Sequence, residues 1–214
     1  MRYDAVIFDL DGTLLDTLGD LHAGVNHALA LNDFPERTLE EIRIFVGNGI
    51  RNLMGKAVPG SFENPLFEKV FEDFKSYYSA HCRDLTHPYR GIEELTGELH
   101  RRGLKLAIVS NKRDAEVKNL NEEFFGDQFV TALGEREGVA RKPAPDSVLH
   151  VMELLGVSRE RTLYVGDSEV DVRTAENAGV DCVAVTWGFR TREELLEAGA
   201  EVLIDSPLEL LEKL

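Results

Sequence analysis

The amino-acid sequence predicts an α/β protein, with a doubly wound, mostly parallel sheet and a helical segment inserted near its start. Short apolar runs rich in β-branched residues alternate with stretches of helical period, as expected of strands buried between two layers of helices. Several helical stretches stop at a glycine, the residue that most readily adopts the left-handed conformation at a helix end. One interval between strands is too long for a single crossover helix, and it marks the insertion.

Six runs are predicted to be strands because they are short, apolar and bounded by turn or helix signals. They are Tyr3–Phe8, Lys105–Val109, Phe129–Ala132, Thr162–Val165, Cys182–Val185 and Val202–Ile204. The predicted helices among them are Ile92–Arg102, Asp114–Phe125, Asp146–Leu155 and Asp171–Ala178. Strands that alternate with helices in this way favour a parallel sheet.

Residues 16–86 are surplus to this alternation, since one helix already connects the first two strands. Asp16 is expected to cap the first helix of the segment. Thr38-Leu39-Glu40-Glu41 has the form of a capping box, and Asn64-Pro65 is predicted to open a long aromatic-rich helix. We therefore expect a helical cap domain at 16–86, inserted into a core domain formed by 1–15 and 87–214.

The composition restricts the classes of partner. A formal charge of −15 and a pI near 4.8 oppose extended contact with nucleic acid, because such contact requires basic surfaces. The chain has no apolar run of membrane-spanning length and no signal-peptide pattern, so we expect a cytoplasmic protein without a membrane partner. A small anionic substrate would need local positive charge, for which a bound cation is the simplest source.

Polar residues gather just beyond the predicted strands, where open parallel sheets bind ligands. Most follow the first, second and fourth strands, and one precedes the helix that leads to the fourth. They are Asp9, Asp11, Gly12, Thr13, Ser110, Asn111, Lys142, Asp167, Ser168 and Asp171. Carboxylates, hydroxyls and an ammonium around one crevice meet the requirements of phosphate monoester hydrolysis.

Two aspartates are expected to perform the chemistry. Asp9 is the predicted nucleophile, forming an aspartyl phosphate. Asp11 is the predicted acid and base, and it must start protonated while Asp9 is ionised. Mg²⁺ prefers oxygen ligands, and the predicted set is Asp9, the backbone carbonyl of Asp11, and Asp167.

The remaining polar residues are expected to support these groups. Ser110, Asn111, Lys142 and Gly12 are assigned to the phosphate, the glycine because it lets the chain turn close to it. Asp171 is expected to steady a water ligand of the metal. Thr13 and Ser168 are expected to lie behind the ligands; Ser168 is not a nucleophile, since its motif lacks the final glycine of a nucleophile elbow.

Four motifs carry a resemblance to a known family. DLDGT at 9–13, SN at 110–111, KPAPD at 142–146 and GDSEVD at 166–171 resemble, in order and spacing, the motifs of the haloacid-dehalogenase (HAD) superfamily. The resemblance spans the chain and implies a Rossmann-like core with a helical cap, and the same roles for the matching residues. Haloacid dehalogenases lack the second aspartate of the first motif, so Asp11 implies a phosphatase or phosphomutase.

Two further segments, VGNGIRNLM at 46–54 and GDSEVDVRTAENAG at 166–179, are similar to phosphoglycolate phosphatases. This similarity implies 2-phosphoglycolate as the substrate. In the cap, Arg51 is a candidate to bind a substrate carboxylate. The alternative is that its side chain is exposed to solvent and binds nothing. Gly47, Asn48 and Gly49 are candidates to approach the substrate through backbone N–H groups. An equally good interpretation is that they end one helix and form the turn that follows it.

Other functions stay open on the sequence alone. A phosphosugar mutase, or a hydrolase of pyrophosphate, nucleotides or sugar phosphates, would use the same core. A receiver-type signalling domain would also carry aspartates at strand ends, a hydroxyl and a lysine, but it needs no cap. A calcium loop is excluded, because Leu14 and Val172 stand where such loops require glycine. Monomer and homodimer are equally compatible with the sequence.

Overall fold

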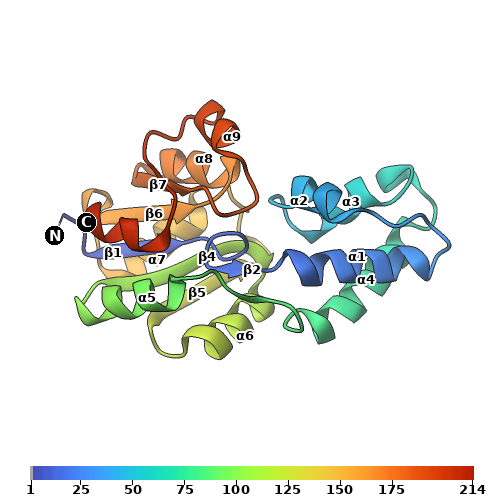
Figure 1. Cartoon of the computed structure of the whole chain (residues 1–214), viewed down its shortest axis with the longest axis horizontal. Helices are drawn as coiled ribbons and strands as arrows, with labels where there is room; N and C mark the ends of the chain where they lie inside the picture. The colour runs from blue at the N-terminus through green and yellow to red at the C-terminus, as the bar shows by residue number, and fades with distance from the viewer. Residues whose placement is uncertain (1) are drawn as a thin grey trace. The chain divides into compact units, whose positions relative to one another are not determined.

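The computed structural model describes residues 2–214 and divides them into two compact units. One unit combines the residues up to Leu15 with Pro88–Leu214, and the other is Asp16–His87. Figure 1 shows the first unit as a sheet with helices and the second as helices alone.

Six parallel strands form the sheet of the first unit, in the order β5-β4-β1-β6-β7-β8. They are β1 (Ala5–Phe8), β4 (Lys105–Arg113), β5 (Phe129–Glu135), β6 (Thr162–Gly166), β7 (Asp181–Val185) and β8 (Leu203–Ile204). The predicted fold class is confirmed.

The central strand β1 is buried on both faces, as its unbroken apolar sequence requires. Val6 and Phe8 pack on one side with helices α5 (Ile92–Arg101) and α6 (Asp114–Phe125). Ala5 and Ile7 pack on the other with α7 (Asp146–Leu155) and α8 (Glu169–Ala178). The alternation has the period of two that a strand imposes, and the chain is therefore wound on both faces of the sheet.

Several predicted boundaries differ from the structure; β5, for example, continues beyond the predicted end at Ala132 to Glu135. β4 does not end at Val109 but continues to Arg113, because it pairs with β5 again beyond an irregularity in register. α8 begins at Glu169, two residues earlier than predicted, because Ser168 and Asp171 form a capping box around its first turn. The sequence did not predict α9 (Arg192–Glu197) or the 3₁₀ turns η2 (Arg159–Arg161) and η3 (Pro207–Glu212).

The second unit packs its helices around their own apolar core. They are α1 (Leu18–Ala30), α2 (Leu39–Phe45), α3 (Ile50–Ala57), the 3₁₀ turn η1 (Ser61–Glu63) and α4 (Phe67–His81). The predicted capping box at Thr38 is confirmed. Asn64 does not open α4; its carboxamide oxygen accepts from the Leu66 N–H, and the helix starts at Phe67. Asp16 accepts from the Leu18 N–H, although Thr17 holds the N-cap position.

A buried carboxylate in α1 holds the returning end of the second unit. Asp20 accepts hydrogen bonds from the N–H groups of Leu85 and Thr86, each at 2.9 Å, and from the Thr86 hydroxyl at 2.7 Å. Close by in sequence, β2 (Leu15–Asp16) pairs with β3 (His87–Pro88) in a small sheet of two strands. The point where the chain enters this unit therefore lies beside the point where it leaves.

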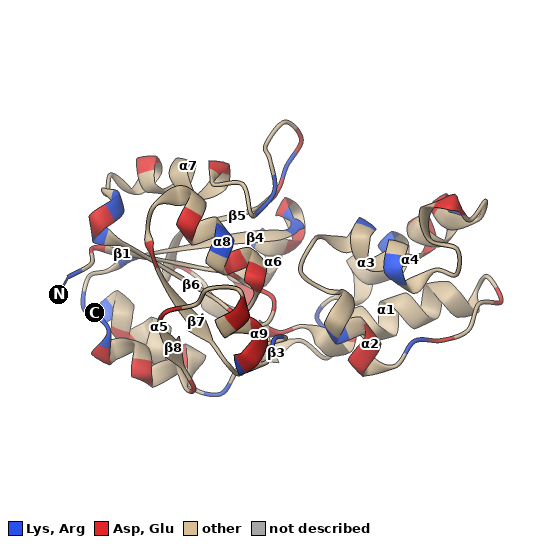
Figure 2. Ribbon diagram, turned by 90° about the horizontal axis from the view of Figure 1, so that it is seen from above, with Lys and Arg blue, Asp and Glu red and all other residues tan. Residues whose placement is uncertain are grey.

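The acidic character of the sequence is visible on the helices. In Figure 2, Asp and Glu mark turns of α5, α8 and α9. Among residues 2–214, no helix combines the length and apolar character that crossing a membrane requires. The predicted cytoplasmic location and the absence of nucleic-acid partners stay predictions.

Candidate active site

Three neighbouring strands of the sheet bring the motif residues together. Asp9 follows β1 directly, and its N–H donates to the carbonyl of Val165 at 2.9 Å. Asp167 follows β6, and Ser110 lies near the end of β4. Because β4, β1 and β6 are parallel neighbours, these residues share the carboxyl edge of the sheet.

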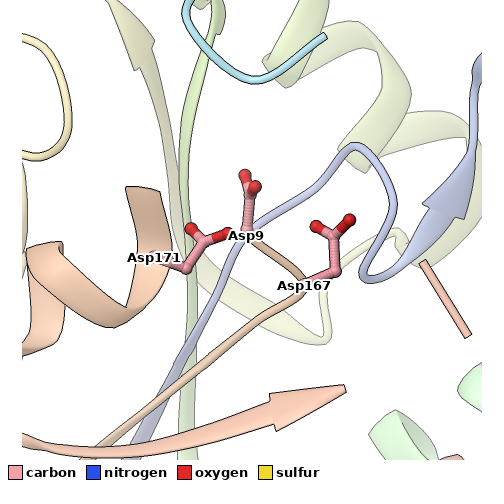
Figure 3. A group of neighbouring side chains, drawn as sticks. All are labelled: Asp9, Asp167 and Asp171. Atoms are coloured by element: carbon pink, nitrogen blue, oxygen red, sulfur yellow. The ribbon is translucent and has the colours of Figure 1, made fainter. Parts of the chain in front are cut away.

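Three buried carboxylates converge at this edge. Asp9, Asp167 and Asp171 each offer an oxygen atom, and these atoms lie within 4.8 Å of one another. Figure 3 shows Asp9 between Asp171 on one side and Asp167 on the other. Among the described residues this group does not include the Asp11 side chain. Clustered carboxylate oxygens suit a hard cation such as Mg²⁺.

Asp171 has its acceptor capacity filled by the protein. Its Oδ1 accepts from Lys142 Nζ at 2.8 Å and from the Tyr164 hydroxyl at 3.0 Å. Its Oδ2 accepts from the N–H and the hydroxyl of Ser168, at 3.1 and 2.6 Å. A carboxylate has about four acceptor positions. Asp171 therefore anchors Lys142 and caps α8, and its predicted role of steadying a water ligand stays a prediction.

Asp167 sits in a close-fitting pocket of backbone. Thr13 Oγ1 donates to it at 3.1 Å and the Phe189 N–H at 2.7 Å. A Cβ on Gly12, where φ is +84°, would lie 2.3 Å from Asp167 Oδ2, and one on Gly188 would lie 2.4 Å from its Cβ. Gly12, predicted to face the phosphate, thus makes room for Asp167. Burial and then the charges of Asp171 and Asp9 raise the pKa of Asp167 well above its usual value.

Lys142 supplies the positive charge of the site. Its residue is 5 % exposed, and its Nζ lies 2.9 Å from Asp9 Oδ1 and 2.8 Å from Asp171 Oδ1. Burial acts to lower the pKa of this ammonium, but the charges of Asp171 and Asp9 raise it well above its usual value. Lys142 is therefore a fixed cation beside the predicted nucleophile.

Asn111 holds Lys142 by its backbone. The Asn111 carboxamide donates to the Lys142 carbonyl at 3.0 Å and accepts from the Lys142 N–H at 2.9 Å. Its side chain is thus engaged with the main chain of Lys142, and its predicted contact with phosphate stays a prediction. Ser110 Oγ accepts from the Lys112 N–H at 3.2 Å. Both residues and Lys142 line a small pocket bounded also by residues 134–136, 139–141 and 147.

Burial governs the charge of Asp9. Desolvation raises the pKa of its carboxyl to about 7, with Lys142 opposing the rise and Asp171 and Asp11 adding to it. The sequence-based expectation placed the protonated carboxyl at Asp11 alone. A cation bound beside Asp9 would favour the ionised form of this carboxyl.

Asp11 has a partner that the sequence analysis missed. Lys112 Nζ lies 3.0 Å from Asp11 Oδ1, and the lysine side chain is only 2 % exposed. Lys112 directly follows the serine and asparagine of the second motif, which is the one signal that could have singled it out. The carboxyl of Asp11 thus contacts an ammonium.

The predicted specificity residues lie in the second unit. Arg51 pairs with Glu68 and lies over the rings of Phe67 and Phe71, at 5.1 and 5.2 Å. A substrate carboxylate would have to compete with Glu68 for this guanidinium. Gly47 follows α2 and Gly49 precedes α3, both with positive φ, so the segment containing Asn48 is a turn between helices. The predicted contacts of this segment with substrate stay predictions.

Comparisons with known proteins identify the family. Residues 6–185 match the model of a family described as haloacid dehalogenase-like hydrolase. The chain belongs to this family. The chain is 35 % identical to phosphoglycolate phosphatase 1 of Pseudomonas aeruginosa, over 96 % of this chain and 78 % of that one. It is 32 % identical to the N-acetylmuramic acid 6-phosphate phosphatase of the same species, over 100 % and 96 % of the two chains.

A solved structure agrees with this placement among the haloacid dehalogenase-like hydrolases. A provisionally assigned phosphoglycolate phosphatase from Lactobacillus delbrueckii subsp. bulgaricus superposes with a TM-score of 0.94 at 38 % identity, covering 100 % of this chain and 98 % of that one. The sequence-based predictions of the superfamily, of a hydrolase and of likeness to phosphoglycolate phosphatases are confirmed.

Proposed function

We propose that this haloacid dehalogenase-like hydrolase cleaves a small phosphate monoester with the help of Mg²⁺, using Asp9 as nucleophile. The observation that carries the proposal is the position of the Asp9 carboxylate, which contacts the Lys142 ammonium and belongs to the same carboxylate group as Asp167. A nucleophile needs an adjacent cation to meet an anionic phosphoryl group.

The proposed metal ligands are the carboxylates of Asp9 and Asp167 and the backbone carbonyl of Asp11. The fit is supported by the all-oxygen donor set and by the room that Gly12 and Gly188 leave around Asp167. Mg²⁺ would neutralise charge on the nucleophile and the phosphoryl oxygens. Lys142, with Ser110, is proposed to hold phosphoryl oxygens, while Asn111 fixes Lys142.

The proposed reaction has two displacements. An Asp9 oxygen bonds to phosphorus as the bond from phosphorus to the ester oxygen breaks, and Asp11 gives its proton to the departing alkoxide. Asp11 then takes a proton from water, whose oxygen attacks phosphorus and releases Asp9 and inorganic phosphate. Lys112, in contact with Asp11, is placed to hold its carboxyl throughout.

We propose 2-phosphoglycolate as the substrate, because several relatives at 32–35 % identity are named phosphoglycolate phosphatase. A sugar phosphate is the second candidate, favoured by the relative named for N-acetylmuramic acid 6-phosphate. The proposed partner is in either case a small phosphorylated metabolite, met in the cytoplasm without nucleic acid.

Phosphate release from a panel of esters tests this function. The panel contains 2-phosphoglycolate, sugar 6-phosphates, nucleotides and pyrophosphate, each with Mg²⁺ and with excess chelator. We expect Mg²⁺-dependent multiple turnover with the highest kcat/KM for 2-phosphoglycolate. Isomer exchange of a sugar phosphate without net release would favour a mutase, and a single stoichiometric phosphorylation would favour a receiver domain. Either result would contradict the proposal.

Affinity for Mg²⁺ is expected to rise with pH. Below a pKa of about 7, Asp9 carries a proton that the ion must displace, so binding should strengthen at least about tenfold from pH 6 to pH 8. Trp187, the single tryptophan, reports binding by fluorescence, because its indole N–H contacts the Thr13 carbonyl at 3.0 Å. The variant Asp9→Asn should weaken the dependence and leave the part due to Asp167, whose pKa is also raised. Affinity that is constant or falls with pH would contradict the expectation.

A further inference from the structure

The Lys142 ammonium has three protons and three acceptors. Asp171 Oδ1 lies 2.8 Å from Nζ, Asp9 Oδ1 2.9 Å and the Tyr164 hydroxyl oxygen 3.1 Å. An ammonium donates three hydrogen bonds when each proton has one partner. The three contacts in the structure thus use its full capacity, and a phosphoryl oxygen can be bound only in exchange for one of them.

Tyr164 differs from the other two acceptors. It lies on β6 with no exposed surface, and its contact with Nζ is the longest of the three. It is also neutral, because burial raises the pKa of its hydroxyl well above the usual value. Hydrogen bonds from an ammonium to ionised carboxylates are stronger than those to a neutral hydroxyl. Tyr164 is therefore the partner that Lys142 gives up at least cost.

The hydroxyl of Tyr164 has a second bond that keeps it in place. It donates its proton to Asp171 Oδ1 at 3.0 Å, so it stays held when Lys142 turns away. Asp171 retains its contacts with Lys142 and Ser168 in the same exchange. The Lys142 ammonium can then move off the tyrosine oxygen while the contacts of Asp171 with Tyr164 and Ser168 hold the rest of the cluster in place.

We propose that Tyr164 is the resting partner of the third Lys142 proton and that a phosphoryl oxygen replaces it when phosphate or substrate binds. This inference rests on the proposed function, in which Lys142 holds the phosphoryl group. Tyr164 is a positioning residue that acts through Lys142. Its bond to the ammonium stabilises the free enzyme and is lost on binding, so it weakens the affinity for phosphate.

Removal of the hydroxyl should tighten phosphate binding. For Tyr164→Phe we expect the inhibition constant of inorganic phosphate, measured with Mg²⁺, to fall about three- to tenfold. This factor corresponds to the free energy of one hydrogen bond, which the variant does not have to break when phosphate binds. The matched control is Tyr3→Phe, which removes the hydroxyl of another largely buried tyrosine, one that donates to Asp181 at 2.7 Å where β7 begins. The control should leave the inhibition constant unchanged. A merely structural Tyr164 would lower the melting temperature in the variant without tightening phosphate, which would overturn the inference.

The variant Lys142→Met separates this inference from the proposed function. If it keeps normal turnover and phosphate inhibition, the proposed role of Lys142 fails. If it loses both while Tyr164→Phe binds phosphate as the unaltered enzyme does, only the exchange is overturned.

A structure of the unaltered protein with Mg²⁺ and beryllium fluoride, which mimics the phosphoryl group on Asp9, gives an answer even if Tyr164→Phe fails to fold. We expect Lys142 Nζ to contact fluoride and to lie beyond hydrogen-bond distance of Tyr164. Persistence of the Tyr164 contact alongside a fluoride contact would overturn the exchange.

Discussion

Asp9→Asn is expected to reduce turnover by at least about 10⁴-fold, because the carboxamide cannot form the aspartyl phosphate. The fold should persist. Asparagine keeps an oxygen that accepts from the Leu10 N–H, a bond of 2.6 Å, and the substitution removes a charge that is costly to bury. The measurements are steady-state phosphate release and the melting temperature.

Asp4→Asn is the matched control for this change. Asp4 precedes the same strand at its opposite end, and its carboxylate is exposed and pairs with Arg161. Exposed ion pairs contribute little to stability, so activity should stay within about twofold of normal. If Asp9→Asn retained more than a hundredth of normal turnover while it remained folded, Asp9 would not be the nucleophile.

Asp11→Asn is expected to lower kcat for an alkyl phosphate by about 10²–10⁴-fold, the usual contribution of a positioned acid or base. The asparagine can still accept a hydrogen bond from Lys112, so the local structure should hold. The loss in kcat/KM, which reports the steps up to the first irreversible one, should be much smaller for an aryl phosphate whose leaving group is stable without a proton. Equal losses in kcat/KM for both substrates would reject Asp11 as the acid.

The sequence was sufficient where local pattern determines structure. The bounds of α6 and α7 were predicted from helical period and terminal glycines, and the six strands were found from their apolar runs. It was insufficient at β4, where the polar run Ser-Asn-Lys-Arg lies in a strand only because β5 pairs beside it. Pairing between strands is a tertiary effect that local propensity does not contain.

The sequence likewise predicted only those site residues that lie next to recognisable elements. Asp9, Asp167 and Lys142 were found because each follows or precedes a recognisable element and carries a charge. Tyr164 and Gly188 were missed because their roles depend on distances across the fold: the first needs Asp171 and Lys142 on other elements, and the second needs the backbone of Gly12 nearby. The tyrosine looks like any aromatic residue of a buried strand.

The pairing of β2 with β3, together with the bonds from Asp20 to Leu85 and Thr86, gives the helical unit adjoining ends. A segment whose ends meet can be lengthened, shortened or exchanged at a small entropic cost to the rest of the chain, because loop-closure entropy grows only slowly with length. The sheet and its catalytic edge can thus stay unchanged through evolution while the 16–87 segment is remodelled. Changes of sequence and length in this segment thus need not disturb the parallel sheet.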